Sequence, residues 1–217
     1  MRKPCCGLAP EGMPFLFLAT LATVVFALAG WVVASLVGLG VVAFILNFFR
    51  DPERVVPQDE GVVVAPADGR VVRVAPMPDP VHGTPRMAVC IFMNVFNVHV
   101  NRTPVAGVVR QMRYIPGKFF NASLDKASTD NERCIMDLET EDGGRFTVVQ
   151  IAGLIARRIV DWVRPGDTLP RGVRFGMIRF GSRVDLYLPP DYEPVIQETE
   201  HTVAGQTVVA RKREPLG

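Results

Sequence analysis

The start of the chain differs sharply from the rest in its pattern of hydrophobic and polar positions. Residues 12–49 contain no Asp, Glu, Lys or Arg. An uninterrupted apolar stretch of about 20 residues already suffices for a membrane helix, and one straight helix of this greater length would overshoot about 30 Å of hydrocarbon. A helical hairpin fits better, with helices over 15–29 and 31–49 and a break near Gly30. A single span with an overhang is the alternative.

The charges that flank this segment predict its orientation. Arg2 and Lys3 precede it, and Arg50 and Arg54 follow it. Because basic residues are retained on the cytoplasmic side, a hairpin with basic residues at both ends keeps both ends there. We therefore expect residues 1–49 to attach the protein to the cytoplasmic face of the cell membrane. A cleaved signal peptide is disfavoured, since its apolar region would be much shorter.

The remainder, residues 50–217, has the pattern of an antiparallel, mainly β domain. Apolar runs rich in valine alternate with Gly- and Pro-containing turn signals, which is typical of short strands. Strands are predicted at 62–65, 70–75, 87–93, 105–114, 133–139, 146–151, 174–180 and 183–188. Such a domain forms a curved sandwich or barrel. Residues 121–131 are expected to form a short helical or irregular insert, and the polar tail from residue 197 onward is expected to end loosely.

Two segments resemble the two halves of a lipoyl or biotinyl carrier domain. They are residues 63–72 (VVAPADGRVV) and 163–172 (VRPGDTLPRG). The resemblance implies a barrel-sandwich-hybrid-like, or lipoyl-like, β domain. It does not imply a carrier function, because no lysine lies at the hairpin tip.

Composition narrows the classes of function. The chain has 217 residues, with 24 Lys plus Arg against 22 Asp plus Glu, so its net charge of +2 does not indicate a nucleic-acid partner. Its four cysteines show neither a CxxC pair nor metal-ligand spacing. We therefore expect no metal and no disulfide, as in a reducing compartment.

The dipeptide Gly181-Ser182 is the first candidate for chemistry. It lies between two strand-like runs near the C-terminus. A glycine without a side chain lets a serine hydroxyl approach its carbonyl carbon, and it tolerates the backbone strain of such an attack. The simpler interpretation is a turn, which is the commonest use of these two residues.

A general base for such an attack would be a histidine, and the chain has three. His82 lies in a Pro- and Gly-rich loop and His201 in the polar tail, so both are expected to be solvent-facing. His99 lies in an alternating apolar segment, where the simpler interpretation is a hydrogen-bonded packing residue. Asp68 precedes a glycine, and this pair is also typical of a hairpin turn.

Several segments, in order along nearly the whole chain, resemble phosphatidylserine decarboxylase in its short, archaeal-type form. They are residues 48–54 (FFRDPER), 65–69 (APADG), 97–107 (NVHVNRTPVAG), 114–119 (YIPGKF) with 131–133 (NER), and 180–182 (FGS). No single segment is decisive, but the ordered set is specific.

The resemblance implies self-cleavage between Gly181 and Ser182 into a large chain, residues 1–181, and a small chain, residues 182–217. The two chains would form a heterodimer, with further oligomerisation left open. Ser182 would become a covalent pyruvoyl group, the electron sink that decarboxylation of an amino acid requires. The implied activity is conversion of the membrane phospholipid phosphatidylserine to phosphatidylethanolamine in phospholipid biosynthesis.

The resemblance also implies roles for individual residues. Asp68, His99 and Ser182 would act in self-cleavage in the manner of a Ser-His-Asp arrangement. Lys118, Arg133 and Arg102 would contact the phosphate and carboxylate of the lipid head group, since cations pair with such oxygens. The simpler interpretation of each is a solvated surface charge.

One departure from the longer-form branch leaves the relay open. That branch has a second histidine three residues after the first, where this chain has Arg102. Either His99 acts alone, or Arg102 serves as an anion contact. Two other functions also stay open: a non-catalytic lipoyl-like or phosphocarrier module tethered to a membrane, and a pyruvoyl enzyme that acts on a soluble amino acid.

Overall fold

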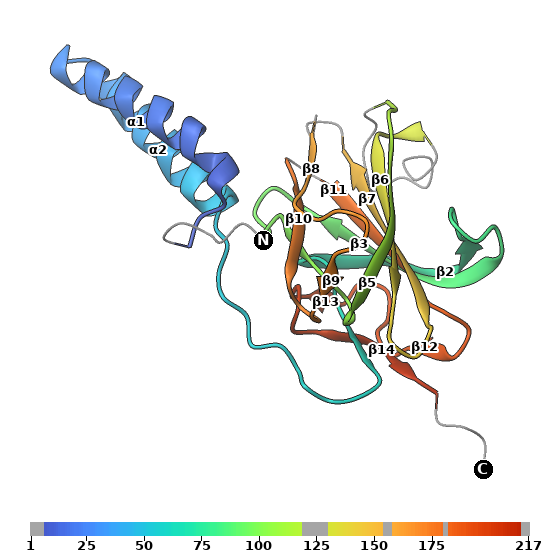
Figure 1. Cartoon of the computed structure of the whole chain (residues 1–217). Helices are drawn as coiled ribbons and strands as arrows, with labels where there is room; N and C mark the ends of the chain where they lie inside the picture. The colour runs from blue at the N-terminus through green and yellow to red at the C-terminus, as the bar shows by residue number, and fades with distance from the viewer. Residues whose placement is uncertain (1–6, 119–129, 154–157, 180–181, 214–217) are drawn as a thin grey trace. The chain divides into compact units, whose positions relative to one another are not determined.

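The computed structural model describes residues 7–118, 130–153, 158–179 and 182–213. The chain divides into two compact units, residues 2–53 and residues 54–217. The first is helical and the second consists of strands, as Figure 1 shows. The expected combination of a helical hairpin and a mainly β domain is confirmed.

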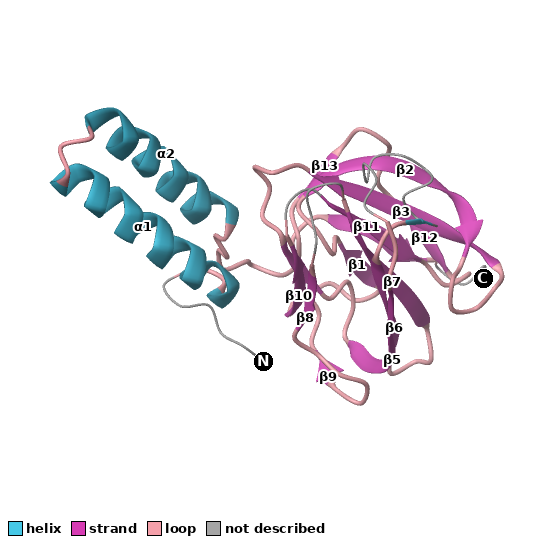
Figure 2. Ribbon diagram, turned by 90° about the horizontal axis from the view of Figure 1, so that it is seen from above, coloured by secondary structure: helices cyan, strands magenta, loops and turns pink. Residues whose placement is uncertain are grey.

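The helical unit contains a short 3-10 helix, η1 (Pro10–Gly12), followed by α1 (Met13–Leu28) and α2 (Val32–Phe48). The two α-helices lie antiparallel and side by side (Figure 2). Gly30 has a φ of +74°, the left-handed conformation that only glycine adopts cheaply, and this lets the chain reverse between the helices. Gly38 allows the close approach, because a Cβ there would lie 2.4 Å from Thr23 Oγ1.

Both helices are apolar around their whole circumference rather than along one stripe. Large apolar side chains are exposed on each, including Phe17 and Leu28 on α1 and Val33 on α2. A helix with apolar side chains on every side is usually buried in protein or in lipid rather than exposed to water. The helix over Pro10–Leu28 is long and apolar enough to cross a membrane, whereas Val32–Phe48 is shorter.

The β unit contains three sheets. The strands are β1 (Val62–Val64), β2 (Gly69–Pro78), β3 (Pro85–Met93), β4 (Val100–Arg102), β5 (Gly107–Ile115), β6 (Arg133–Glu139), β7 (Arg145–Ala152), β8 (Ile159–Asp161), β9 (Thr168–Leu169), β10 (Arg174–Ile178), β11 (Ser182–Tyr187), β12 (Tyr192–Pro194), β13 (His201–Thr202) and β14 (Val208–Lys212). The large sheet has the order β13-β2-β3-β11-β7-β6-β5-β9, and two small sheets have the orders β1-β14-β12 and β4-β10-β8.

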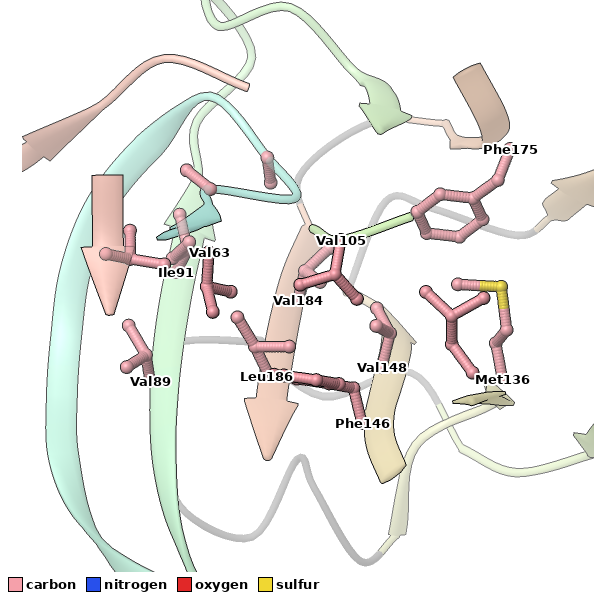
Figure 3. Packing of buried hydrophobic residues seen from close by; sticks show 14 of the residues in the cluster. Val63, Val89, Ile91, Val105, Met136, Phe146, Val148, Phe175, Val184 and Leu186 are labelled. Atoms are coloured by element: carbon pink, nitrogen blue, oxygen red, sulfur yellow. The ribbon is translucent and has the colours of Figure 1, made fainter. Parts of the chain in front are cut away.

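The main core lies on one face of the large sheet and is closed by the small sheets. In Figure 3, Val184 and Leu186 of β11 lie beside Val148 and Phe146 of β7. A second, smaller cluster on the opposite face includes Cys90 and Tyr187. Strand β11 is therefore buried on both faces, although it carries Ser182, Arg183 and Asp185 among its apolar residues.

The polar tail from residue 197 onward contains two strands that pair with distant parts of the chain, while residues 214–217, where the tail is expected to end loosely, lie outside the described residues. His201–Thr202 pairs with β2, and Val208–Lys212 pairs with both β1 and β12. These short strands gain their stability from partners far away in the sequence, so local polarity does not reveal them. The predicted insert over 121–131 lies mostly outside the described residues.

Candidate active site

Ser182 opens β11, the strand at the centre of the large sheet. It pairs with Met93 of β3 on one side and with Ala152 of β7 on the other. Its side chain is fully buried on the main-core face, and within the described part of the chain its Oγ has no hydrogen-bond partner. Such a hydroxyl costs about 1–3 kcal/mol, so its retention calls for a chemical explanation. Gly181, the other half of the predicted scissile bond, lies outside the described residues.

His99 directly precedes β4 and is fully buried. Its Nδ1 lies 2.9 Å from the carbonyl oxygen of Asn97. Because a carbonyl only accepts hydrogen bonds, Nδ1 carries the proton, and in the neutral ring Nε2 keeps the basic lone pair. This is the tautomer that a general base requires.

The backbone brings His99 towards the segment that leads to Ser182. The carbonyl of His99 accepts a hydrogen bond of 3.3 Å from the amide of Ile178, the last residue of β10. Next to this bond, Val100 pairs with Met177. Ile178 is only four residues before Ser182, so the fold draws together two residues that lie far apart in the sequence.

Asp68 lies in the turn before β2 and is also buried. Its Oδ2 accepts a hydrogen bond of 2.9 Å from Arg54 Nη2, and its Oδ1 accepts one of 2.7 Å from the amide of Ala204. These contacts fix the carboxylate against residues 203–205, a turn whose Gly205 amide also binds Ala65. A relay from Asp68 to His99 stays a prediction.

Arg102 reaches the same turn and is 4% exposed. Its Nη1 donates to the Gly172 carbonyl at 3.0 Å, and its Cδ lies 3.0 Å from the place that a Cβ on Gly205 would take. Arg102 thus contacts both carrier-like segments, the second through its guanidinium and the first through its backbone amide, which donates to the carbonyl of Pro66 at 2.9 Å. Its predicted contact with a substrate anion stays a prediction.

Lys118 is connected to Ser182 through Asn131 and Ala152. Lys118 forms a parallel bridge with Asn131, whose Nδ2 donates to the carbonyl of Ala152 at 2.7 Å. Ala152 is the ladder partner of Ser182. Lys118 is exposed, as a residue that meets a lipid head group should be.

Arg133 lies on the other face of the sheet. It pairs with Ile151, which in turn pairs with Arg183, and residues paired in this way share a face. Its Nη1 donates to the carbonyl of Asn131, and it lines a cavity of about 280 Å³ together with Asp185 and Tyr187. The structure therefore does not bring Arg133 together with Ser182.

Polar side chains that the sequence analysis missed occupy the main-core face near Ser182. Gln150 Nε2 donates to Asn101 Oδ1 at 2.9 Å, and Asn101 Nδ2 contacts Met93 Sδ at 3.7 Å. Both amides are almost fully buried. In the sequence they can be recognised as polar residues that face inward within a mainly apolar strand, namely the Gln of VVQIA and the second Asn of NVHVNR.

Asp161 of β8 belongs to the same polar group. Gln150 Nε2 and Asp161 Oδ1 lie 3.1 and 3.3 Å from the point where a Cβ on Gly176 would stand. Burial raises the pKa of Asp161, and a hydrogen bond with Cys134 opposes that shift. Burial likewise raises the pKa of Cys134. The face around Ser182 is thus lined with hydrogen-bonding groups held away from water.

The described ranges contain no cluster of His, Cys, Asp or Glu that would hold a metal ion. The site offers three kinds of chemical group: the buried hydroxyl of Ser182, the imidazole of His99 whose basic nitrogen is Nε2, and the paired amides of Asn101 and Gln150. These define a β-rich domain, preceded by an apolar helical hairpin, with a buried serine hydroxyl as its candidate reactive group.

Comparison with known proteins identifies the family. The model of the phosphatidylserine decarboxylase family matches residues 41–210. A phosphatidylserine decarboxylase proenzyme of Nitratidesulfovibrio vulgaris is 61% identical, with 98% of each chain covered. Proenzymes of the same name from Oleidesulfovibrio alaskensis and Solidesulfovibrio magneticus are 59% and 56% identical, with at least 98% of each chain covered. The chain belongs to the phosphatidylserine decarboxylase family, and the resemblance found in its sequence is confirmed.

Proposed function

We propose that this chain is a proenzyme that cuts itself between Gly181 and Ser182, and that the resulting enzyme converts phosphatidylserine to phosphatidylethanolamine. The observation that carries the proposal is the buried Ser182 hydroxyl, which has no hydrogen-bond partner among the described residues, in a chain of this family. A hydroxyl with an unused donor and lone pairs is available to attack a neighbouring carbonyl carbon.

The cleavage can be written with every atom accounted for. Ser182 Oγ bonds to the Gly181 carbonyl carbon while His99 Nε2 accepts the hydroxyl proton. The bond from that carbon to the Ser182 nitrogen then breaks, and the nitrogen takes up the proton, leaving an ester. Removal of the Ser182 α-proton expels residues 1–181 as a carboxylate. The dehydroalanine left on the small chain tautomerises, and water releases ammonia.

The product of these steps is a pyruvoyl group at residue 182. The group supplies a conjugated ketone that accepts the electron pair left when carbon dioxide departs. The site fits such a group, since its precursor hydroxyl is buried without a hydrogen-bond partner among the described residues and the surrounding face is shielded from water. Asn101 and Gln150 are placed to bind and orient polar atoms there, and Lys118 is our candidate for the head group.

The strand pairing supports a stable heterodimer after cleavage. Strands β11, β13 and β14 of the small chain each pair with strands of the large chain, namely β3 and β7, β2, and β1. The small chain is thus part of two sheets and stays in place without a covalent link. Higher oligomers are compatible with this arrangement.

The helical hairpin supports attachment to the membrane that contains the substrate. Helices α1 and α2 present apolar side chains outward, and the helix ending at Leu28 is long enough to span a bilayer. We place both ends of the hairpin at the cytoplasmic face, on the basis of their flanking basic residues. The expected test is flotation of the full chain with phospholipid vesicles.

Intact mass of the purified chain tests the central claim. The parent should give two chains that meet at residues 181 and 182, the shorter one with a ketone and no free terminal amine. Ser182→Ala should stay uncut and release no carbon dioxide from phosphatidylserine, while the matched variant Ser35→Ala on α2 behaves like the parent. An unbroken parent would favour a carrier-like module, and cleavage of Ser182→Ala at this bond would disprove the role of the hydroxyl. Equal release of carbon dioxide from soluble serine would disprove the lipid specificity.

A further inference from the structure

The residue after Ser182 is held by an unusual contact. Arg183 is 1% exposed and Asp185 is fully buried, both on the face of β11 opposite to Ser182. Arg183 Nε donates to Asp185 Oδ1 at 2.5 Å, and Nη2 donates to Oδ2 at 3.0 Å. Nη2 also donates to Cys90 Sγ at 3.1 Å, on the neighbouring strand β3.

The charge states of these groups suit a permanent contact. Burial alone would lower the pKa of Arg183, but the Asp185 carboxylate reverses the shift and raises it. Burial, together with Asp185, raises the pKa of Cys90, so its sulfur remains a neutral thiol. Burial raises the pKa of Asp185 as well, and Arg183 opposes that shift.

The contact is poorly explained as a source of stability. Arg183 and Asp185 are two residues apart on one strand, so their ion pair does not join different strands. Burying two charges costs desolvation energy that the pair recovers only in part, and apolar residues of similar volume often serve as well. The contact with Cys90 instead fixes the orientation of residue 183 relative to β3.

Cleavage makes that orientation critical. Before the cut, Ser182 is held by the chain on both sides. After the cut it is a chain end, and chain ends fray unless something holds them. Residue 182 also loses its backbone N–H in the proposed chemistry, so the first ladder donor of β11 disappears just where the reactive group must stay aligned.

We propose that Arg183, Asp185 and Cys90 form an anchor that holds the new end of the small chain in register after self-cleavage. In this anchor Arg183 is a positioning residue: it acts on the far face of the sheet and touches no reacting atom. This inference rests on the proposed function, because it requires the cut at Ser182.

The experiment compares the same substitution in the cut and the uncut chain. Arg183→Met/Asp185→Asn removes both charges, so no buried charge is left alone. It is made in the parent, which cuts itself, and in Ser182→Ala, which does not. Arg110→Met is the matched control, because Arg110 also makes two contacts with one carboxylate, Glu139 Oε2 at 3.0 Å and Oε1 at 3.4 Å, but on an exposed part of the sheet.

Hydrogen exchange of peptides covering 182–188 and steady-state kinetics are the two measurements. We expect the double variant to raise exchange in the cut enzyme about tenfold more than in the uncut chain, as local fraying does. We expect kcat to fall about ten- to a hundredfold with KM changed less than about twofold, because misplacing a reacting group mainly costs chemistry rather than binding. Arg183→Lys keeps the positive charge but loses the planar guanidinium that donates to both oxygens of Asp185. Its hydrogen exchange and kcat should lie between those of the parent and the double variant.

Each other result contradicts the anchor. An equal rise of exchange in cut and uncut chains would show a purely structural role, and an unchanged kcat would show that the end needs no anchor. If both Arg183 variants fold but stay uncut, the contact acts before cleavage, not after it. If the double variant does not fold, Arg183→Lys decides by the same two measurements. A parent that is never cut overturns the proposed function and this inference together, whereas a cut parent with indistinguishable variants overturns only the anchor.

Discussion

The buried polar side chains on the two faces of strand β11 differ in their hydrogen bonding. On one face the Ser182 hydroxyl is buried and has no hydrogen-bond partner in the described residues. On the other, one residue further on, Arg183 and Asp185 satisfy each other and contact Cys90. Neighbouring residues of one strand thus carry the proposed reactive hydroxyl, without a hydrogen-bond partner in the described residues, and a buried ion pair.

The sheet thus separates the proposed reactive hydroxyl of Ser182 from the Arg183–Asp185 ion pair on its other face. A buried hydroxyl without a partner is destabilising by about 1–3 kcal/mol, a noticeable part of the total stability of a domain. The fold tolerates it at the central strand, where ladders on both sides fix the backbone. The charges are placed where they cannot interfere with the serine, because the sheet itself lies between.

The largest expected effect concerns the base on the reactive side. His99→Asn keeps a donor near the Asn97 carbonyl but has no basic nitrogen, so self-cleavage should slow by about 10²- to 10⁴-fold, the usual contribution of a general base. The measurement is a time course of cleavage on a denaturing gel after synthesis of the full chain. His201→Asn, at an exposed position on β13, is the control. Cleavage of His99→Asn at the parental rate would remove His99 from the mechanism.

The next effect concerns the contribution of the buried Arg183–Asp185 pair to the free energy of unfolding. Arg183→Met alone leaves the Asp185 charge buried without its partner, which should lower the free energy of unfolding by about 3–5 kcal/mol. Arg183→Met/Asp185→Leu should recover most of this loss, since no charge remains. Both are measured by denaturant unfolding in the uncut Ser182→Ala chain, so that cleavage does not complicate the comparison. A double variant as unstable as the single one would contradict this account of the pair.

Much of the fold follows from local pattern, but the shorter strands do not. The strands β3, β6, β7 and β11 lie within two residues of their predicted limits, because turn residues bound each of these strand-like runs. By contrast β4 and β13 have two or three residues each and exist through partners distant in the sequence. No local pattern carries that information.

The candidate site divides in the same way. Ser182 and His99 were predicted from motifs, and the structure buries both and brings their segments together. Asn101 and Gln150 were missed because an inward amide becomes meaningful only when the strand register places it near Ser182. Register also explains why Arg133, in a matched motif, lies on the opposite face: one step along a strand reverses the side.

A smaller effect concerns the carboxyl of Asp161 on the reactive side. Burial raises its pKa, so the folded state holds the proton more tightly than the unfolded state does. Ionisation therefore costs stability as pH rises from about 4, the unfolded value, through the folded pKa, and the cost is complete above it. Asp161→Asn removes this cost and should raise Tm near neutral pH by about 2–4 °C, with no gain near pH 4.

The control for this prediction is the exposed carboxylate of Glu141. Thermal unfolding of the full chain in detergent at both pH values is the measurement, and Glu141→Gln should leave Tm unchanged at each. An Asp161→Asn variant that is less stable than the parent near neutral pH would show that the ionised carboxylate is stabilised instead.

The smallest effect is expected at the surface pair that resembles the buried one. Arg110 also makes two contacts with a single carboxylate, but its side chain is 52% exposed and that of Glu139 is 26% exposed. Water and salt screen such a pair, and Glu139 keeps a second partner, Arg145, when Arg110 is removed. Arg110→Met should therefore change the free energy of unfolding by less than about 1 kcal/mol, and less still at about 0.5 M salt. Denaturant unfolding at low and high salt measures both values. A loss as large as that of Arg183→Met would mean that two-contact geometry, rather than burial, makes the Arg183 pair sensitive.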